Sequence, residues 1–228
     1  MTNLEALSNP LQVKSLRLAN RVVTPAMGTG YGEKDSTVSE RLLAYIEERA
    51  RGGVGLIITE ECAVDPRGRN MQREIGAWDD RFIPGLAALA ERAHRHGSGI
   101  ALQLHHAGRE TLSAVIGCKL EAPSELPSVI YNQPCEAMSV DRIREIVQAF
   151  GAAAARAKEA GFDAVEIHGA HGYLVHQVSA PFSSKRTDEY CCSDENRSQF
   201  DLEVLRAVRA RVGDDFPIIA RISAEECI

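Results

Sequence analysis

The segment His168–Tyr173 (HGAHGY) carries two histidines and a tyrosine directly after the apolar run 164–167 (AVEI). A buried strand that ends in such a segment brings three proton-binding side chains to one point in space. Two N–H donors can stabilise an oxygen that becomes negative, and a phenol can act as an acid. His168, His171 and Tyr173 therefore predict a site that activates a carbonyl group. The alternative is a glycine-rich turn whose polar residues are incidental.

The chain alternates short apolar runs with amphipathic helical patterns. The runs are rich in Val and Ile and nearly continuous, as expected for strands covered on both faces; they occupy residues 21–24, 54–59, 100–104, 164–167 and 217–222. Helices are expected between them, with starts signalled by the capping box Thr37–Glu40, by Asp79–Asp80, by Ser139 and by Ser193 or Asp194. Each helix is followed by glycine, at Gly52–Gly53, Gly97, Gly161 and Gly213. This order predicts βαβ units and a parallel sheet.

Polar residues gather where three of the runs end, at 103–109, 168–173 and 221–223. Active sites of (β/α)8 TIM-type barrels collect at the carboxyl ends of the strands, which favours a barrel. An open doubly wound sheet binds ligands at the same edge and is the alternative, although no G-x-G-x-x-G follows the first run. The chain is expected to form a single domain over residues 1–228 that supplies about strands 1–5 and is truncated before strands 6–8. The segment 106–138 exceeds an ordinary connection and predicts a lid or substrate loop.

Composition excludes several classes of protein. The net charge of −6 and the pI near 5.7 argue against nucleic acid as a partner. No apolar run approaches the roughly 20 residues that span a bilayer, and the N-terminus lacks a secretion signal, so a cytoplasmic location is expected. The 6 cysteines are scattered, and we expect reduced thiols without a metal site.

The residues above resemble the Old Yellow Enzyme family, the FMN-dependent NADH:flavin oxidoreductases and ene-reductases. The similarity runs along essentially the whole chain and is most specific from residue 166 to 197. The segments that carry it are 11–23, Pro25–Met27, 55–60 (GLIITE), 103–109 (QLHHAGR), 122–124 (APS), 166–174 (EIHGAHGYL), 179–181 (SAP), 185–190 (KRTDEY) and 195–197 (ENR).

The resemblance implies an FMN site, NAD(P)H as the reductant and an enone or enoate as the substrate. The implied cofactor-binding residues are Thr24, Pro25, Ala26, Met27, Glu61, Gln103 and Arg221. Gln103 would bind the flavin pyrimidine through its amide, and Arg221 would place a cation beside flavin N1 and O2. His168 and His171 would bind the carbonyl oxygen while hydride moves from flavin N5 to the β-carbon. Tyr173 would protonate the α-carbon.

The chain departs from the family pattern at several positions. Cys191–Cys192 stand where the family has a glycine pair, and Gly28 stands where many members keep threonine or cysteine. In the family, the loops after strands 7 and 8 bind the FMN phosphate, and larger members add an iron–sulfur cluster. Neither feature is encoded in these residues, so we expect this chain alone to hold little FMN.

Other interpretations remain open at this stage. Without the resemblance, Gln103 could cap a neighbouring backbone group and Arg221 could form a structural ion pair. The chain could be an inactive, truncated fragment of such an enzyme. A third possibility is a metal-dependent barrel hydrolase or lyase that uses His105, Glu166, His168 and His171 as ligands. A homo-oligomer is also possible.

Overall fold

The computed structural model describes residues 3–225, and one parallel sheet forms its centre. The strands of this sheet are β3 (Val23–Thr24), β4 (Leu56–Ala63), β6 (Gly99–His105), β9 (Ala164–Gly169) and β10 (Ile218–Ile222). Their order is β10-β9-β6-β4-β3, with β5 (Ile75–Gly76) added to β4. The strands of this path therefore stand in the sheet in the same order as along the chain, as in a barrel, and the order never reverses as it does in a doubly wound sheet.

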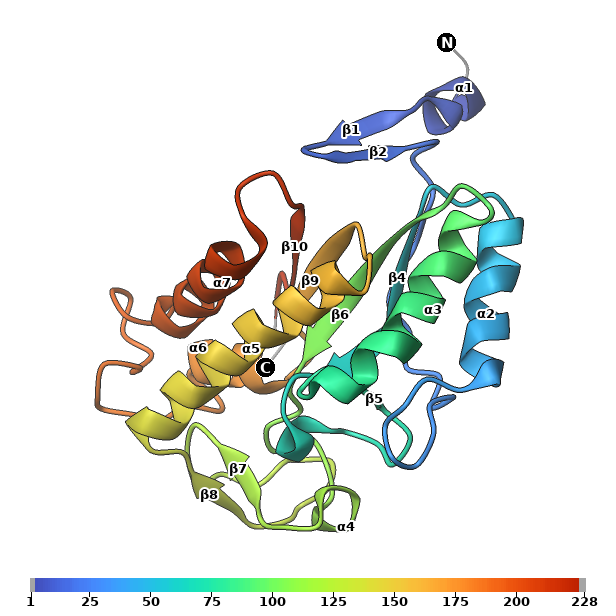
Figure 1. Cartoon of the computed structure of the whole chain (residues 1–228). Coiled ribbons are helices and arrows are strands. Elements are labelled where there is room, and N and C mark those ends of the chain that lie inside the picture. Colours follow the sequence, from blue (N-terminus) through green and yellow to red (C-terminus); the bar gives the residue numbers. More distant parts are fainter. Residues whose placement is uncertain (1–2, 226–228) are drawn as a thin grey trace.

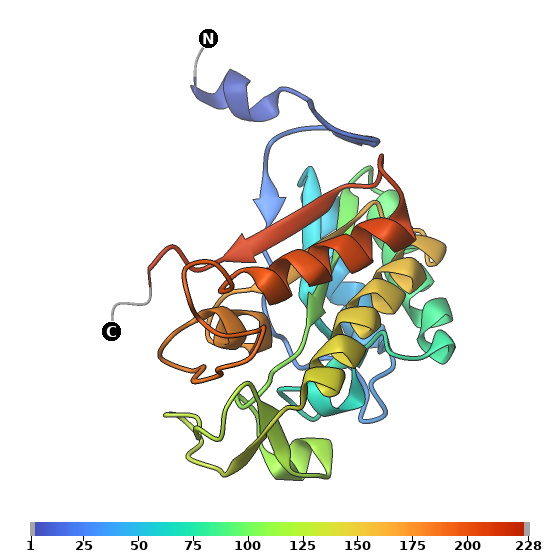
Figure 2. The ribbon, with the colours of Figure 1, turned by 90° about the vertical axis from the view of Figure 1, so that its left-hand side faces the viewer.

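The long helices all cover one face of this sheet (Figures 1 and 2). They are α2 (Glu40–Arg51), α3 (Ile83–His94), α5 (Val140–Glu159) and α7 (Gln199–Val212). Consecutive helices of this series contact each other. Helices on one face only, over a curled parallel sheet, are the arrangement of a barrel wall. The predicted barrel-type fold is therefore confirmed, and this chain supplies five neighbouring strands of it.

Alternation along the strands separates the helix-facing core from the inner face. On β6, Ile100, Leu102 and Leu104 belong to the core beneath the helices, whereas Ala101 packs in a second cluster on the opposite face. Gln103 shares the face of Ala101 because side chains alternate along a strand. Polar groups on this inner face are therefore directed toward the barrel axis.

The helix starts agree only in part with the sequence patterns. Ser139 caps α5 as expected, accepting from the backbone N–H of Arg142. The predicted start of α2 at Thr37 is wrong: Ser39 is the cap, while the Thr37 hydroxyl bonds Asp35.

Helices α3 and α7 begin later than the sequence patterns predict. Asp79 caps a short 3-10 turn, η2 (Asp80–Phe82), that leads into α3. Ser193 and Asp194 do not cap α7, which begins only after Ser198. Residues 193–198, between the expected and the observed start of α7, form a turn instead.

The glycines that follow the helices have positive φ, and Gly213 combines it with an extended ψ of 173°. Gly53, Gly97, Gly161 and Gly213 have φ values of 81°, 77°, 85° and 82°. Residues with a Cβ rarely adopt this conformation, so glycine permits the sharp turn from each helix toward the next strand.

An N-terminal hairpin, which the sequence patterns did not indicate, covers one end of the inner face. It consists of β1 (Leu11–Val13) and β2 (Leu16–Leu18), preceded by α1 (Asn3–Ser8). Leu16 and Leu18 pack in one cluster with Leu56 and Ile58 of β4. Figure 1 shows this hairpin at the end of the sheet opposite β7 and β8. These apolar contacts therefore cover the inner face of the sheet at the end opposite β7 and β8.

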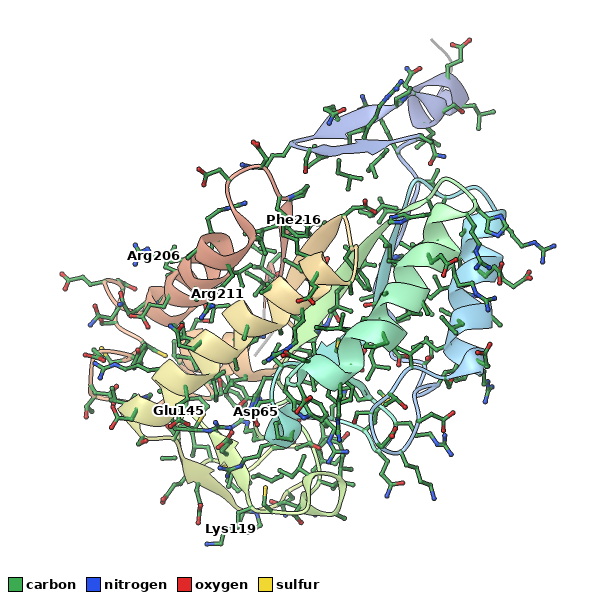
Figure 3. The ribbon with its side chains drawn as sticks, viewed as in Figure 1. Asp65, Lys119, Glu145, Arg206, Arg211 and Phe216 are labelled. Atoms are coloured by element: carbon green, nitrogen blue, oxygen red, sulfur yellow. The ribbon has the colours of Figure 1, made fainter. Side chains whose placement is uncertain are left out.

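The remaining elements lie at the other end of the sheet. They are η1 (Pro66–Gly68), α4 (Ser113–Ile116), β7 (Leu120–Ala122), β8 (Cys135–Ala137) and α6 (Leu174–Ser179). Arg142 of α5 fixes β7 there by bonding both Glu121 and Asp65. Figure 3 shows Asp65 beside the end of α5 that carries Glu145. Among residues 3–225, no helix combines the length and the apolar character that crossing a membrane requires.

Candidate active site

The carboxyl end of β9 turns sharply and brings the predicted catalytic residues together. His168 lies within β9 and is buried, and the turn at 171–172 follows the end of the strand at Gly169. His171 has a left-handed backbone with φ of 59°, and its N–H donates to the hydroxyl of Ser223 beyond β10 at 3.1 Å. A left-handed conformation is uncommon for histidine and is found at functional sites more than elsewhere.

Four aromatic rings pack against one another at this point. The ring centroid of His168 lies 5.0 Å from that of His171 and 5.1 Å from that of Tyr173. His105, at the end of β6, completes the cluster with centroid distances of 4.4 Å to Tyr173 and 5.5 Å to His168. The structure therefore brings His168, His171 and Tyr173 together and adds His105 beside them.

Burial keeps both inner histidines neutral near pH 7. Loss of hydration, with the nearby rings of His105 and His171, lowers the pKa of His168 to about 3. Loss of hydration also lowers the pKa of His105 to about 4. His105 Nδ1 lies 2.9 Å from the carboxylate of Glu74, whereas Nδ1 of His168 is buried without a hydrogen-bond partner among residues 3–225. A buried imidazole nitrogen without a partner is a free hydrogen-bonding position for a bound molecule.

The hydroxyl of Tyr173 has one hydrogen-bond partner in the described part of the chain. Nδ2 of Asn70 donates to the phenol oxygen at 3.1 Å and to Oε1 of Glu61 at 3.0 Å. Burial raises the pKa of Tyr173, and the hydrogen bond from Asn70 partly offsets that rise. Sequence reasoning missed Asn70 and Glu74, because both lie in the irregular connection after β4, where no pattern marks them.

Gln103 and Arg221 meet at the carboxylate of Glu166. Nε2 of Gln103 donates to Oε1 at 2.6 Å, and Arg221 donates from Nε to Oε1 at 2.9 Å and from Nη2 to Oε2 at 3.3 Å. Arg221 therefore forms the ion pair that the residues alone had left open. The hydrogen bonds of Arg221 to Glu166 use Nε and Nη2, which leaves Nη1 as a donor for a ligand.

A β-bulge in β4 aligns Glu61 with this group. Ile58 pairs with Ala101 and Glu61 pairs with Gln103, so the β4 side has one residue more than the β6 side. The bulge also buries Glu60, which accepts from the backbone N–H of Thr29 at 2.9 Å. Burial raises the pKa of Glu60 to about 7.

The segment after β3 lies at the open edge of the sheet. Val23 is 43% exposed and Met27 is 56% exposed, while Thr24 and Ala26 are partly buried. A Cβ placed on Gly28 would lie 2.5 Å from Oε1 of Glu61, so the end of β3 approaches the end of β4 closely. Ala26 packs against the inner-face cluster that contains Ala101, on the face that also carries Gln103. An apolar segment on the same face as polar donors suits a flat ring with one polar edge. The predicted flavin-contacting residues are thus compatible with a flavin ring.

A cavity of about 350 Å³ adjoins the ring cluster on the side of His171. Its wall includes Arg109, Val129 and Ile130 of the long segment 106–138, together with Phe182. The segment expected to act as a lid or substrate loop therefore borders the candidate site. His168 and Tyr173 are not among the residues that line this cavity.

The metal hypothesis is not supported by the positions of its four ligands. Within residues 3–225, the group whose ligand atoms lie within 4.8 Å of one another is Asp65, His106 and Glu121, which includes none of them. Arg142 already bridges that group, since Nη2 lies 2.8 Å from Asp65 and 2.7 Å from Glu121. It is therefore an ion-pair network in this structure.

The adjacent cysteines Cys191 and Cys192 have an ordinary backbone. Neither Cys191 nor Cys192 is among the residues with positive φ, so cysteine is not strained there. The cysteines at 62, 118, 135, 191 and 192 are free thiols, and Cys227 lies outside the described residues.

Comparison with known proteins identifies the family. Residues 6–228 match the model of the NADH:flavin oxidoreductase / NADH oxidase family. The chain is 43% identical over 231 residues to "NADH oxidase" of Thermoanaerobacter brockii, covering 100% of this chain and 35% of that protein. It is 42% identical over 221 residues to "NADPH dehydrogenase" of Bacillus subtilis, covering 96% of this chain and 64% of that protein.

A solved structure is similar over nearly all of this chain. Old Yellow Enzyme from Pichia sp. AKU4542 superposes with a TM-score of 0.88 at 32% identity, covering 95% of this chain and 59% of that one. The chain thus spans about a third to two thirds of the length of the proteins it matches. With its barrel-type sheet and the match over residues 6–228, the chain belongs to the NADH:flavin oxidoreductase / NADH oxidase family, which includes the Old Yellow Enzymes.

Proposed function

We propose that the protein is an FMN-dependent NAD(P)H oxidoreductase that reduces the carbon–carbon double bond of α,β-unsaturated carbonyl compounds. The observation that carries this proposal is the convergence of the His168, His171 and Tyr173 rings at the end of β9. Two imidazoles and a phenol at one point supply the groups needed to bind a carbonyl oxygen and to deliver a proton. Family membership supports flavin and NAD(P)H as the redox partners.

The residues around Glu166 would hold the flavin ring. The amide of Gln103 can both donate to and accept from a pyrimidine edge. Arg221 remains a permanent cation, and its ion pair with the buried Glu166 keeps it beside that edge. Thr24 to Met27 would line one face of the ring, and Glu61 lies close to Gly28, which follows this segment. When bound, FMN supplies the redox chemistry: it takes reducing equivalents from NAD(P)H and gives them to the substrate.

The two histidines would hold the carbonyl oxygen of the substrate. The low pKa of His168 keeps it neutral at physiological pH. One ring nitrogen then carries a hydrogen, and this N–H would donate a hydrogen bond to the substrate oxygen without giving up its proton. Its buried nitrogen without a partner is satisfied when a ligand binds. Such donors become more important as the oxygen acquires enolate character. Tyr173, beside both rings, then protonates the α-carbon.

The test is spectroscopic and catalytic. The purified protein, with its complete natural chain and with FMN added, should absorb between roughly 350 and 500 nm and oxidise NADH or NADPH when 2-cyclohexenone is present. Product analysis should show the saturated ketone. Protein that remains colourless after FMN addition, or that consumes NAD(P)H without forming the saturated ketone, would contradict the proposal.

A further inference from the structure

We infer that Asn70 positions Tyr173 as the proton donor, by donating to the phenol oxygen and so leaving the phenol hydrogen free to point at the substrate. The inference rests on the proposed role of Tyr173 and assigns a new role to a residue in an irregular connection. Asn70 lies after η1 and far from Tyr173 in sequence, yet its Nδ2 lies 3.1 Å from the phenol oxygen.

The orientation of the Asn70 amide follows from its second partner. Nδ2 also lies 3.0 Å from Oε1 of Glu61, and a carboxylate accepts hydrogen bonds but does not donate them. The NH2 end of the amide must therefore face both oxygens, and Oδ1 is left buried without a partner. An amide held this way can only donate to Tyr173. The phenol cannot use its own hydrogen on Asn70 and keeps it for another acceptor.

The backbone of Asn70 is itself anchored to the ring cluster. Its N–H donates to Oε2 of Glu74 at 2.6 Å, and Oε1 of Glu74 lies 2.9 Å from Nδ1 of His105. The His105 ring packs edge-on against Tyr173 with a centroid distance of 4.4 Å. Asn70 and His105, both bonded to Glu74, therefore contact Tyr173 at its hydroxyl and at its ring.

Donation to the phenol oxygen also affects proton transfer. A hydrogen bond to the phenolate that remains after transfer stabilises that anion. Opposing influences act on the same group: burial and the charges of Glu61, Glu74 and Tyr131 raise the pKa of Tyr173, whereas Asn70 lowers it. The rings of His105 and His168 also face the phenol. Asn70 is thus the group that supports ionisation among several that oppose it.

The experiment compares Asn70→Ala and Asn70→Asp with the matched control Asn196→Ala. Asn196 donates to Cys191, away from the ring cluster. The complete flavin-loaded protein should show the alkene-reducing half-reaction slowed about tenfold in both Asn70 variants, a part of the contribution of a general acid. Flavin reduction by NAD(P)H and the affinity for a phenol ligand should stay unchanged. Asn70→Asp keeps the shape of the side chain, so it provides the measurement if the alanine variant folds poorly.

A second readout does not depend on turnover. In protein labelled with [13Cζ]tyrosine, the Tyr173 resonance, assigned with Tyr173→Phe, should titrate at higher pH in Asn70→Ala than in the wild type or in Asn196→Ala. An unchanged titration together with an unchanged half-reaction would overturn the role of Asn70. If Tyr173→Phe leaves the half-reaction intact while Asn70→Ala still shifts the titration, the proposed function of Tyr173 fails and the coupling between the two residues stands.

Discussion

The guanidinium of Arg221 and the carboxylate of Glu166 form an ion pair between the last two strands of the sheet, with Nε and Oε1 2.9 Å apart. The Glu166 side chain is 2% exposed and that of Arg221 is 29% exposed. Gln103 donates to the same carboxylate. Three strands, β6, β9 and β10, therefore contribute to one polar group on the inner face of the sheet.

Replacing Glu166 with glutamine should destabilise the fold. The variant keeps the shape of the side chain but removes the charge that binds Arg221, and hydrogen bonds to charged groups contribute about 1.5–3 kcal/mol each. We expect a loss of about 2 kcal/mol in the free energy of unfolding, measured by urea denaturation. Glu145→Gln is the control, since this exposed residue pairs with Arg142 and should change stability by less than about 0.5 kcal/mol. Equal effects of the two variants would contradict a special role for Glu166.

Tyr173→Phe should separate the two half-reactions of the flavin-loaded protein. Only the step that reduces the alkene needs a proton delivered to carbon, and loss of a general acid slows such a step by about 10²–10⁴-fold. Flavin reduction by NAD(P)H should remain nearly unchanged. Stopped-flow absorbance of the flavin measures both. An equal loss in both half-reactions would show that Tyr173 positions the cofactor instead.

The double variant His168→Ala, His171→Ala should lose affinity for phenols and carbonyl ligands while keeping FMN. Donors to an oxyanion matter most for the ligand that carries the oxygen, at about 3 kcal/mol for one lost donor. Titration with a phenol, followed by the flavin spectrum, measures the change. Unchanged phenol affinity would remove the histidines from the ligand site.

His168 should make the fold sensitive to acid. Its pKa in the folded chain is about 3, below its ordinary value, so its neutral form contributes stability that is present above about pH 6.5. That contribution is lost as the pH falls from 6.5 toward 3 because the unfolded chain binds the proton more readily. The unfolding free energy of His168→Asn, measured relative to wild type by urea denaturation at pH 7, 6, 5 and 4, should therefore rise as the pH falls. A difference that does not change with pH would argue against a buried neutral imidazole.

A side chain at Gly28 should compete with Glu61 for space. The Cβ of Gly28→Thr would come 2.5 Å from Oε1 of Glu61, which is 8% exposed and bonded to Asn70. Overpacking of this kind costs about 1–3 kcal/mol. Adding Glu61→Ala should restore much of that loss, and a double-mutant cycle of unfolding free energies measures the coupling. Additive effects would show that the two positions do not compete.

The sequence alone indicated much of the fold because its signals are local. Apolar runs mark strands β3, β4, β6, β9 and β10, and glycines such as Gly161 mark the helix ends through their backbone freedom. The cap of α7 was predicted wrongly, since a turn at 193–198 intervenes and nothing in its composition excludes a helix. The hairpin β1–β2 was missed because its strands are only 3 residues each.

In the candidate site too, the sequence indicated some residues and only the tertiary structure showed their partners. His168, His171 and Tyr173 lie in one short segment, so their spacing identified them and a single turn brings them together. The partners of these residues come from distant connections: Asn70 and Glu74 lie between β4 and α3, and Glu166 is shared by Gln103 and Arg221. Contacts of that kind exist only once parallel strands align their carboxyl ends. The sequence determined which groups are available, and the tertiary structure decided which oxygen each donor meets and which nitrogen is left for a ligand, because that depends on strand register and burial.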